Sequence, residues 1–189
     1  MAAAKLTAQE RGLGFRLMFQ DEARFGRMSL PYSSWAPKPI RPVVDLALVR
    51  EFSYVYCAAS PSDGRTVWAL ADKMNTEEMG NHLLAVSQQF PDELVLMVVD
   101  GASSHKAAAL KIPSNIILHV LPPYSPELNP VEHIWDEMRE KFFANRIFNS
   151  MEQCLGRIKD AIESLGQHRD SMQSLTYWPW IKSANLNLA

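Results

Sequence analysis

The feature that most constrains the fold is an uninterrupted apolar run, LVLMVV, at positions 94–99. Its flanks, PDE before it and DG after it, contain residues that break regular structure. A short apolar run of this kind is typical of a strand whose two faces are both covered, as in the centre of an α/β sheet. We therefore expect a central strand here, followed at once by the carboxylate of Asp100.

A second candidate strand also ends in a carboxylate. In residues 15–21 (FRLMFQD), apolar side chains recur at every second position, and Asp21 falls on the same face. Alternation with a period of two is the pattern of a half-buried strand. If this strand lies parallel to the strand at 94–99, Asp21 and Asp100 leave neighbouring strand ends about 5 Å apart at the backbone. Such a pair of carboxylates would suit a divalent metal ion.

Turn and proline signals divide the rest of the chain. Residues 54–59 and 66–70 flank SPSDG, whose Asp-Gly pair predicts a tight antiparallel hairpin. Residues 115–121 (NIILHVL) are a further short strand. Residues 28–42 contain four prolines and are expected to form an extended arm. Proline donates no hydrogen bond to a sheet and restricts the residue before it.

Three helices are predicted from capping residues and apolar stripes. The first begins at Asn75 in a capping-box pattern and stops at Pro91. The second begins after Asn129, where an N-cap asparagine is followed by proline. The third begins after Ser150 and ends near Gly166. The second helix carries an apolar stripe at helical spacing, made of Val131, Ile134, Trp135, Met138 and Phe142.

This order of strands and helices predicts an α/β fold with a mixed sheet. With 189 residues and 47% apolar content, the chain has the size of one domain. No apolar stretch approaches the roughly 18 to 20 residues that span a bilayer, so we expect a soluble, cytoplasmic protein. Cys57 and Cys154 lie in no metal-binding spacing, which argues against a zinc site or a disulfide framework. The net charge of −2 argues against a free-standing nucleic-acid binder.

Asp21, Asp100 and Glu132 form a candidate site for phosphodiester chemistry. This chemistry needs an activated attacking oxygen and a neutralised leaving oxygen, which two Mg²⁺ ions about 4 Å apart can supply. Carboxylates suit Mg²⁺, and two on adjacent strands with one on a helix across their ends would build such a site. Each acid also has a structural interpretation. Asp21 could be a polar strand terminus, Asp100 could open a turn, and Glu132 could close a capping box with Asn129.

Four sequence blocks occur in a fixed order: QDEARFG, WAPKPIRP, VVDGASSHK and LPPYSPELNPVEHIWDEMRE. They resemble the successive signature blocks of the mariner-like DDE transposases, in their bacterial insertion-sequence branch, over about residues 15–143. The last block is highly specific. The resemblance implies an RNase H-like fold with a five-stranded mixed sheet flanked by helices. It also implies that Asp21, Asp100 and Glu132 are the acidic triad of a Mg²⁺-dependent enzyme, with two ions in the active complex and Mn²⁺ as a substitute.

The function implied by the resemblance is DNA transposition. Members of the family cut the ends of a mobile element by phosphodiester hydrolysis and join its 3′-OH to target DNA, typically at TA dinucleotides. The implied partners are double-stranded DNA, as transposon ends and as target, and a second copy of the chain in the active complex. The implied location is the prokaryotic cytoplasm, with the nucleoid as the place of action.

The family pattern also includes helix-turn-helix DNA-binding modules before the catalytic core. Only about 14 residues precede the first predicted strand here. We therefore expect one catalytic domain across residues 1–189, with a core at about 15–166 and a tail at 167–189. The helix-turn-helix part is expected to be missing or on a separate chain.

Further residues are candidates for supporting roles. His105 could orient a phosphate or stabilise its own loop. Asp136, one helical turn after Glu132, could support the metal site or be a solvated helix charge. Scattered basic residues are usually solvated surface, but four are candidate contacts to the DNA backbone: Lys38, Arg41, Lys106 and Lys111.

Two other functions share much of this pattern. One is a different metal nuclease on the RNase H-like fold, such as a resolvase or a ribonuclease. The other is a decayed or repurposed transposase core that binds partners without catalysis. The PPYSPELNP block argues against the first, and the presence of all three acids argues against the second.

Overall fold

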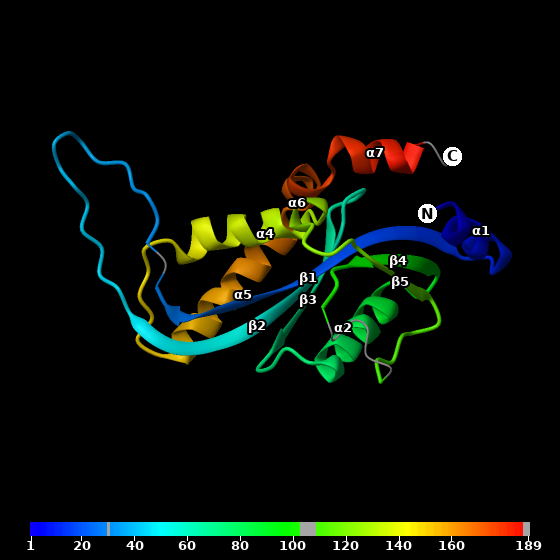
Figure 1. Ribbon diagram of the computed structural model, residues 1–189, viewed down its shortest axis with the longest axis horizontal. Coiled ribbons are helices and arrows are strands. Elements are labelled where there is room, and N and C mark those ends of the chain that lie inside the picture. The colour runs from blue at the N-terminus through cyan, green and yellow to red at the C-terminus, as the bar shows by residue number, and fades with distance from the viewer. Residues whose placement is uncertain (30, 103–108, 187–189) are drawn as a thin grey trace.

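A five-stranded mixed sheet forms the centre of the computed structural model, which describes residues 1–29, 31–102 and 109–186 (Figure 1). Its strands are β1 (Gly14–Met28), β2 (Leu48–Ser60), β3 (Arg65–Ala71), β4 (Glu93–Val99) and β5 (Ile116–Val120). The strand order is β3-β2-β1-β4-β5. β1, β2 and β3 pair antiparallel, whereas β1, β4 and β5 pair parallel. The expected mixed sheet is confirmed, and its antiparallel and parallel halves join at β1.

Helices cover both faces of the sheet, as Figure 1 shows. On one face, α2 (Thr76–Gln89) packs over a core that includes Met18 and Met97. On the other face, the core includes Leu17 and Phe19 and is covered by several helices. These are α1 (Ala2–Glu10), α4 (Val131–Met138), α5 (Met151–Gln167), α6 (Arg169–Thr176) and α7 (Pro179–Leu186). Among the helices of the described residues, none is long and apolar enough to cross a membrane.

β1 is longer than the sequence pattern indicated. The prediction that this strand ends at Asp21 is wrong, because Ala23 and Phe25 continue its buried face and the strand runs to Met28. Its parallel pairing with β4 extends to Phe19, and its antiparallel pairing with β2 begins at the same residue. Asp21 therefore lies inside a strand, just beyond the point where the parallel pairing stops.

Hydrogen bonds confirm the predicted helix starts. Asn75 Oδ1 and Ser150 Oγ each accept a bond from the backbone N–H three residues later, at 2.9 and 3.2 Å respectively. α4 begins at Val131, whose N–H donates to Asn129 Oδ1 at 3.2 Å. A short 3₁₀ turn, η1 (Pro126–Leu128), precedes α4, and a π-helical turn, η2 (Arg139–Phe143), follows it. Local polar residues thus determine where each of these helices begins.

The predicted hairpin and the predicted arm both form. β2 and β3 pair around a turn in which Gly64 has a φ of 65°, a conformation that glycine adopts without strain. A Cβ atom on Gly64 would also collide with the carbonyl of Arg169 at the start of α6. The described arm residues, 29 and 31–47, form neither helix nor strand and project from the body of the domain (Figure 1).

The expected tail at 167–189 is largely part of the packed domain, so the core does not stop near residue 166. α6 and α7 lie over the same face as α4 and bury Met172 and Ile181. The segment before β1 forms α1, which buries Ala4 and Ala8. These short helices escaped prediction because each contributes only a few buried side chains, too few to make a clear helical stripe.

Three polar side chains are fully buried between α2 and the sheet. Gln20, Tyr56 and His82 each have 0% exposure. Within the described part of the chain, neither the amide of Gln20 nor the imidazole of His82 has a hydrogen-bond partner. Burial lowers the pKa of His82 to about 4. The imidazole is therefore neutral near pH 7.

Replacing His82 with leucine should make the domain less sensitive to acid. An unfolded histidine binds a proton below a pKa of about 6.5, whereas folded His82 does so only below about 4. Between these values the unfolded state holds more protons, so stability falls as the pH falls. Between pH 7 and pH 5, the parent should lose about 1–2 kcal/mol more unfolding free energy than His82→Leu.

Urea unfolding at the two pH values measures this difference. His119→Leu is the matched control, because His119 is exposed on β5 and should keep the pH dependence of the parent. If His82→Leu keeps that dependence too, burial of His82 is not the cause.

Candidate active site

The pairing of β1 with β4 brings two of the predicted acids to the same level. Phe19 lies opposite Val98 in the parallel register. The same register carried two residues further places Asp21 level with Asp100. Adjacent strands lie about 4.8 Å apart. Because β4 ends at Val99 while β1 continues, the sheet opens beside Asp21.

A tryptophan of α4 holds Asp21. Trp135 Nε1 donates a hydrogen bond of 2.8 Å to Asp21 Oδ2, and both side chains are buried. Burial and the charge of Glu132 raise the pKa of Asp21 to about 7, and the bond from Trp135 opposes this shift. The surroundings therefore disfavour a negative charge on Asp21 unless a proton or a cation compensates it.

One asparagine connects the segments that carry Asp21 and Glu132. Asn129 Nδ2 donates to the carbonyl oxygen of Gln20 at 3.0 Å, and Asn129 Oδ1 accepts from the N–H of Val131 at 3.2 Å. Gln20 precedes Asp21, and Val131 precedes Glu132. Asn129 is itself buried. This single side chain therefore fixes the start of α4 against β1.

The hydrogen bonds do not support a capping-box role for Glu132. In a capping box the glutamate would accept the N–H of Asn129, but that N–H donates to the carbonyl of Pro126 at 2.9 Å. Partial burial raises the pKa of Glu132, Arg139 opposes the shift, and neighbouring acids that include Asp100 raise it further. Glu132 thus interacts electrostatically with both other acids.

Asp100 has the turn role that the sequence suggested and is also exposed to the site. Its Oδ1 atom accepts a hydrogen bond of 2.9 Å from the N–H of Ala102. A carboxylate has two oxygens and about four acceptor positions, so this bond is compatible with binding a cation. The next two candidates along the chain, His105 and Lys106, lie outside the described residues.

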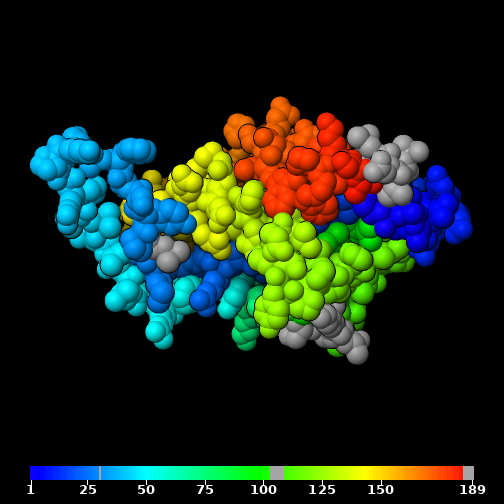
Figure 2. All heavy atoms as spheres, turned by 45° about the horizontal axis from the view of Figure 1, so that its top comes forward, coloured from blue at the N-terminus to red at the C-terminus, as the bar shows by residue number. Residues whose placement is uncertain are grey.

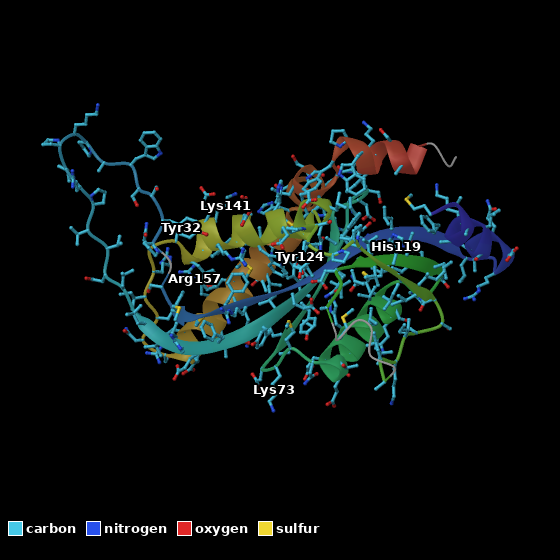
Figure 3. All side chains as sticks on the ribbon, viewed as in Figure 1. Tyr32, Lys73, His119, Tyr124, Lys141 and Arg157 are labelled. Carbon is cyan, nitrogen blue, oxygen red and sulfur yellow. The ribbon has the colours of Figure 1, made fainter. Side chains whose placement is uncertain are left out.

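Asp21, Asp100 and Glu132 line one cleft of about 430 Å³. The loop after β5 forms one wall of it, and Figure 3 labels Tyr124 from this wall. The remaining lining residues are Gly101, Leu121, Pro122, Pro123, Ser125, Pro126 and Asn129. Within the described residues, no three His, Cys, Asp or Glu side chains are arranged as a ready metal site. Like charges without a cation between them repel one another, and this favours separation of the acids.

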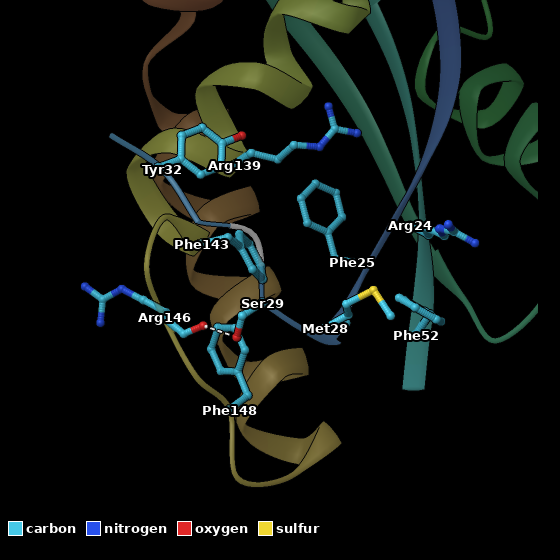
Figure 4. Close-up of a pocket in the computed structure, with 11 residues that line it drawn as sticks. Arg24, Phe25, Met28, Ser29, Tyr32, Phe52, Arg139, Phe143, Arg146 and Phe148 are labelled. Carbon is cyan, nitrogen blue, oxygen red and sulfur yellow. Dashed lines mark hydrogen bonds between the residues drawn. The ribbon is translucent and has the colours of Figure 1, made fainter. Parts of the chain in front are cut away.

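A second cavity, of about 310 Å³, lies at the base of the arm (Figure 4). Arg139 extends over the ring of Phe25, with its guanidinium carbon 5.8 Å from the ring centroid. Arg24 and Arg146 point to opposite sides, away from the cavity centre (Figure 4). Among the residues that the structure describes, the lining of this cavity contains no acid. It therefore offers no ligands for a hard cation, and the acidic cleft is the better candidate site.

The other predicted residues that the structure describes do not line the acidic cleft. Asp136 is exposed and pairs with Arg139 at 3.5 Å. Lys38 and Arg41 are exposed on the projecting arm. Lys111 precedes β5, at the end of the parallel strands opposite Asp100. Roles of these residues in binding stay predictions.

Comparison with known proteins relates this cleft to a family. The family model described as "DDE superfamily endonuclease" matches residues 16–171, a range that includes all three acids. The chain belongs to this family of DDE endonucleases.

Solved structures of the Mos1 transposase share the fold of this DDE endonuclease. The Mos1 paired-end complex with left transposon end has a TM-score of 0.57 and 16% identity, covering 93% of this chain and 60% of that chain. A pre-cleavage Mos1 transpososome has a TM-score of 0.59 and 14% identity, covering 93% and 61%. The likeness confirms the expected RNase H-like fold. The chain spans about 60% of the length of these Mos1 chains.

A curated relative comes from Sinorhizobium fredii. It is an uncharacterized protein, y4pE/y4sA, and is 36% identical over 105 residues. The match covers 55% of this DDE endonuclease and 78% of the relative. Its name gives no activity, so this relative provides no information about function.

Sequence reasoning missed three contributors to the site of this DDE endonuclease. The sequence pattern places Trp135 in the apolar stripe and Asn129 at a helix cap, but each side chain also bonds across to β1. Arg139, which opposes the upward shift in the pKa of Glu132, had no signal of its own in the sequence. A buried tryptophan usually donates its N–H to a partner. This general rule is the one clue in the sequence that Trp135 would form a polar contact.

Asp21→Asn should stabilise the metal-free domain at pH 8 and have less effect at pH 5. Folded Asp21 has a pKa raised to about 7, so the folded state holds more protons than the unfolded state between about pH 4 and pH 7. Stability from this group is therefore present at low pH and is lost as the pH rises through 7. We expect a gain on the order of 3 kcal/mol at pH 8, because asparagine can still accept the bond from Trp135.

Urea unfolding in EDTA measures the effect. Asp63→Asn is the control of opposite sign, because Arg16 donates to Asp63 at 2.8 Å and holds the pKa of Asp63 below its ordinary value despite partial burial. That variant should be destabilised at pH 8. A loss of stability in Asp21→Asn at pH 8 would show that the charge of Asp21 is not opposed by its surroundings.

Proposed function

We propose that this DDE endonuclease is the catalytic domain of a transposase. It cuts the ends of a mobile DNA element by phosphodiester hydrolysis and joins the 3′-OH to target DNA. The observation that carries the proposal is the convergence of Asp21, Asp100 and Glu132 on one cleft. The Mos1 structures, which include a strand transfer complex with the same fold, support the choice of transposition. A repurposed core would have had no reason to keep all three acids in one cleft.

Asp21, Asp100 and Glu132 would hold Mg²⁺, with Mn²⁺ as a substitute, and the active complex would contain two ions. The donor set fits, because it consists of three carboxylates, and burial together with the charges of neighbouring acids raises the pKa values of Asp21 and Glu132. Hard oxygen ligands with uncompensated charge are what Mg²⁺ requires. When bound, such ions activate an attacking oxygen and stabilise a leaving oxygen. Related Mos1 complexes are described with Mn and with Mg.

The residues of the chain have separable roles in this proposal. Trp135 orients one oxygen of Asp21, and Asn129 keeps α4, and with it Glu132, in register with β1. Asp100 reaches the cleft from the end of β4 while its turn bond steadies the carboxylate. These contacts keep the three acids on one cleft, and a bound cation would bring them closer together by removing their mutual repulsion.

Double-stranded DNA is the proposed partner, as transposon end and as target. Mos1 is described in complex with a transposon end. The net charge of −2 suggests that much of the phosphate binding comes from elsewhere. We propose a helix-turn-helix part on a missing or separate segment, a second copy of the chain in the active complex, and contacts from Lys38 and Arg41 on the arm.

Mn²⁺ binding tests the proposed metal site directly. Calorimetric titration of the parent should show weak binding of Mn²⁺. Asp21→Ala combined with Asp100→Ala should abolish it, because two ligands of the site are removed. Asp45→Ala combined with Asp160→Ala is the control, because it removes two exposed acids that do not line the cleft. Unchanged binding in the first double variant would remove the proposed site.

Glu132→Gln separates a metal ligand from a helix cap. Glutamine can still close a capping box, but it is a poorer and uncharged ligand for a hard cation. Without metal, the variant should be at least as stable as the parent, because a repelling charge is gone. Metal-dependent DNA cleavage or strand transfer should fall by at least about 10²-fold.

The activity assay should include any DNA-binding part of the transposase, with Asp21→Asn as the inactive control and Glu127→Gln as the matched surface control. Glu127 is exposed in η1. Full activity in Glu132→Gln beside an inactive Asp21→Asn would exclude Glu132 as the third acid and make Asp136 the next candidate.

A further inference from the structure

Tyr124 combines two features that bring no stability to the isolated domain. Its side chain is fully exposed, at 101% of the reference area. Its φ angle is 57°, a left-handed conformation that bulky residues rarely adopt. A buried aromatic ring could offset such strain through packing, but this ring is in solvent. Backbone strain of this kind clusters at ligand-binding and catalytic sites.

The loop that carries Tyr124 is anchored at both ends. At one end the N–H of Leu121 donates to the carbonyl of Val99 at 2.8 Å. At the other, Asn129 bonds to the carbonyl of Gln20 at 3.0 Å. Pro122, Pro123 and Pro126 restrict the backbone between these points. The ring is therefore presented on a constrained loop, and little conformational entropy remains to be lost on binding.

The position of Tyr124 connects it to the acids. It lines the same cleft as Asp21, Asp100 and Glu132. Figure 2 shows the loop after β5, in yellow-green, as a raised part of the surface. A phosphodiester bound at the three acids would lie beside this loop wall.

The composition of the loop selects the part of DNA that it can contact. Residues 121–130 (LPPYSPELNP) contain no lysine or arginine and contain Glu127. The loop therefore cannot neutralise a phosphate. It offers proline rings and one exposed aromatic face, which suit the face of a nucleobase. Base faces inside a duplex are already stacked, so an accessible one belongs to a nucleotide that has left the stack.

We propose that Tyr124 is a stacking platform for a nucleobase that is unstacked next to the phosphodiester bound by the three acids. This inference rests on the proposed function, because it takes DNA as the substrate of the cleft. The aromatic ring of Tyr124 makes the stacking contact with the base, and the hydroxyl group is not required for it. The strained backbone at Tyr124 directs the ring into solvent, where a base can reach it.

The test measures binding of the full chain to a short duplex that carries one unpaired 2-aminopurine, in the presence of Ca²⁺. The emission of this base falls when it stacks on a ring. The parent and Tyr124→Phe should quench it and bind with similar Kd values. Tyr124→Ala should lose the quenching and raise Kd about 5- to 100-fold, the range for loss of one base–aromatic stack. Binding of the fully paired duplex should be the same for all three.

Trp35→Ala is the matched control, because Trp35 is equally exposed, at 104%, but lies on the arm. It should bind the unpaired probe as the parent does. Absence of quenching by the parent, parent-like binding by Tyr124→Ala, or an equal loss in Trp35→Ala or Tyr124→Phe would overturn the proposal.

A separate measurement distinguishes this proposal from the proposed function. Nicking of DNA in Mn²⁺ by the parent, assayed together with any DNA-binding part of the transposase and lost in Asp21→Asn, tests the catalytic role. Tyr124-dependent quenching without nicking would refute the catalytic role alone. Nicking without Tyr124-dependent quenching would refute the stacking role alone. Tyr124→Gly should raise the thermal midpoint relative to Tyr124→Ala, because glycine adopts the left-handed φ angle without strain.

Discussion

The parallel pairing of β1 with β4 is the constraint on which the site depends. It sets Asp21 level with Asp100, and it stops just before the acids while β1 continues. Beyond the end of β4, β1 has no neighbouring strand on that side among the described residues, which leaves a gap in the sheet. Polar side chains at this gap can reach solvent without disrupting the backbone hydrogen bonds of the sheet. The same strand therefore serves as the core of the domain and as one side of an open cleft.

The site also requires that α4 pack beside this gap in one fixed position along β1. Packing of the α4 stripe, with Ile134 and Met138 fully buried, supplies the attraction, but apolar contact alone is not directional. Two directional bonds specify the position, one from Asn129 and one from Trp135. The energy of packing is thus used to hold acids near one another, against their mutual repulsion.

The sequence could predict the parts of this arrangement that depend on local patterns. Short sequence signatures, each only a few residues long, indicate several of these features. They are the strand at 94–99, the hairpin turn, the caps of α2 and α5, and the three acids. The length of β1 could not be read correctly, because an acid within a strand looks like a strand end. The bond between Trp135 and Asp21 joins residues 114 positions apart, and no local pattern records such a contact. α6 and α7 escaped for the same reason, since their helices are stabilised mainly by the core that they complete.

The anchoring of the loop after β5 has a consequence for how such chains can vary in length. Leu121 and Asn129 are the fixed points of this segment, and residues 122–126 between them line the cleft. An insertion or deletion within 122–128 would change the rim and leave the acids where they are. The two residues between Asn129 and Glu132 allow no such change, because adding one would rotate the acid by about 100° around the helix. Length variation among related chains should therefore be tolerated on one side of Asn129 and excluded on the other.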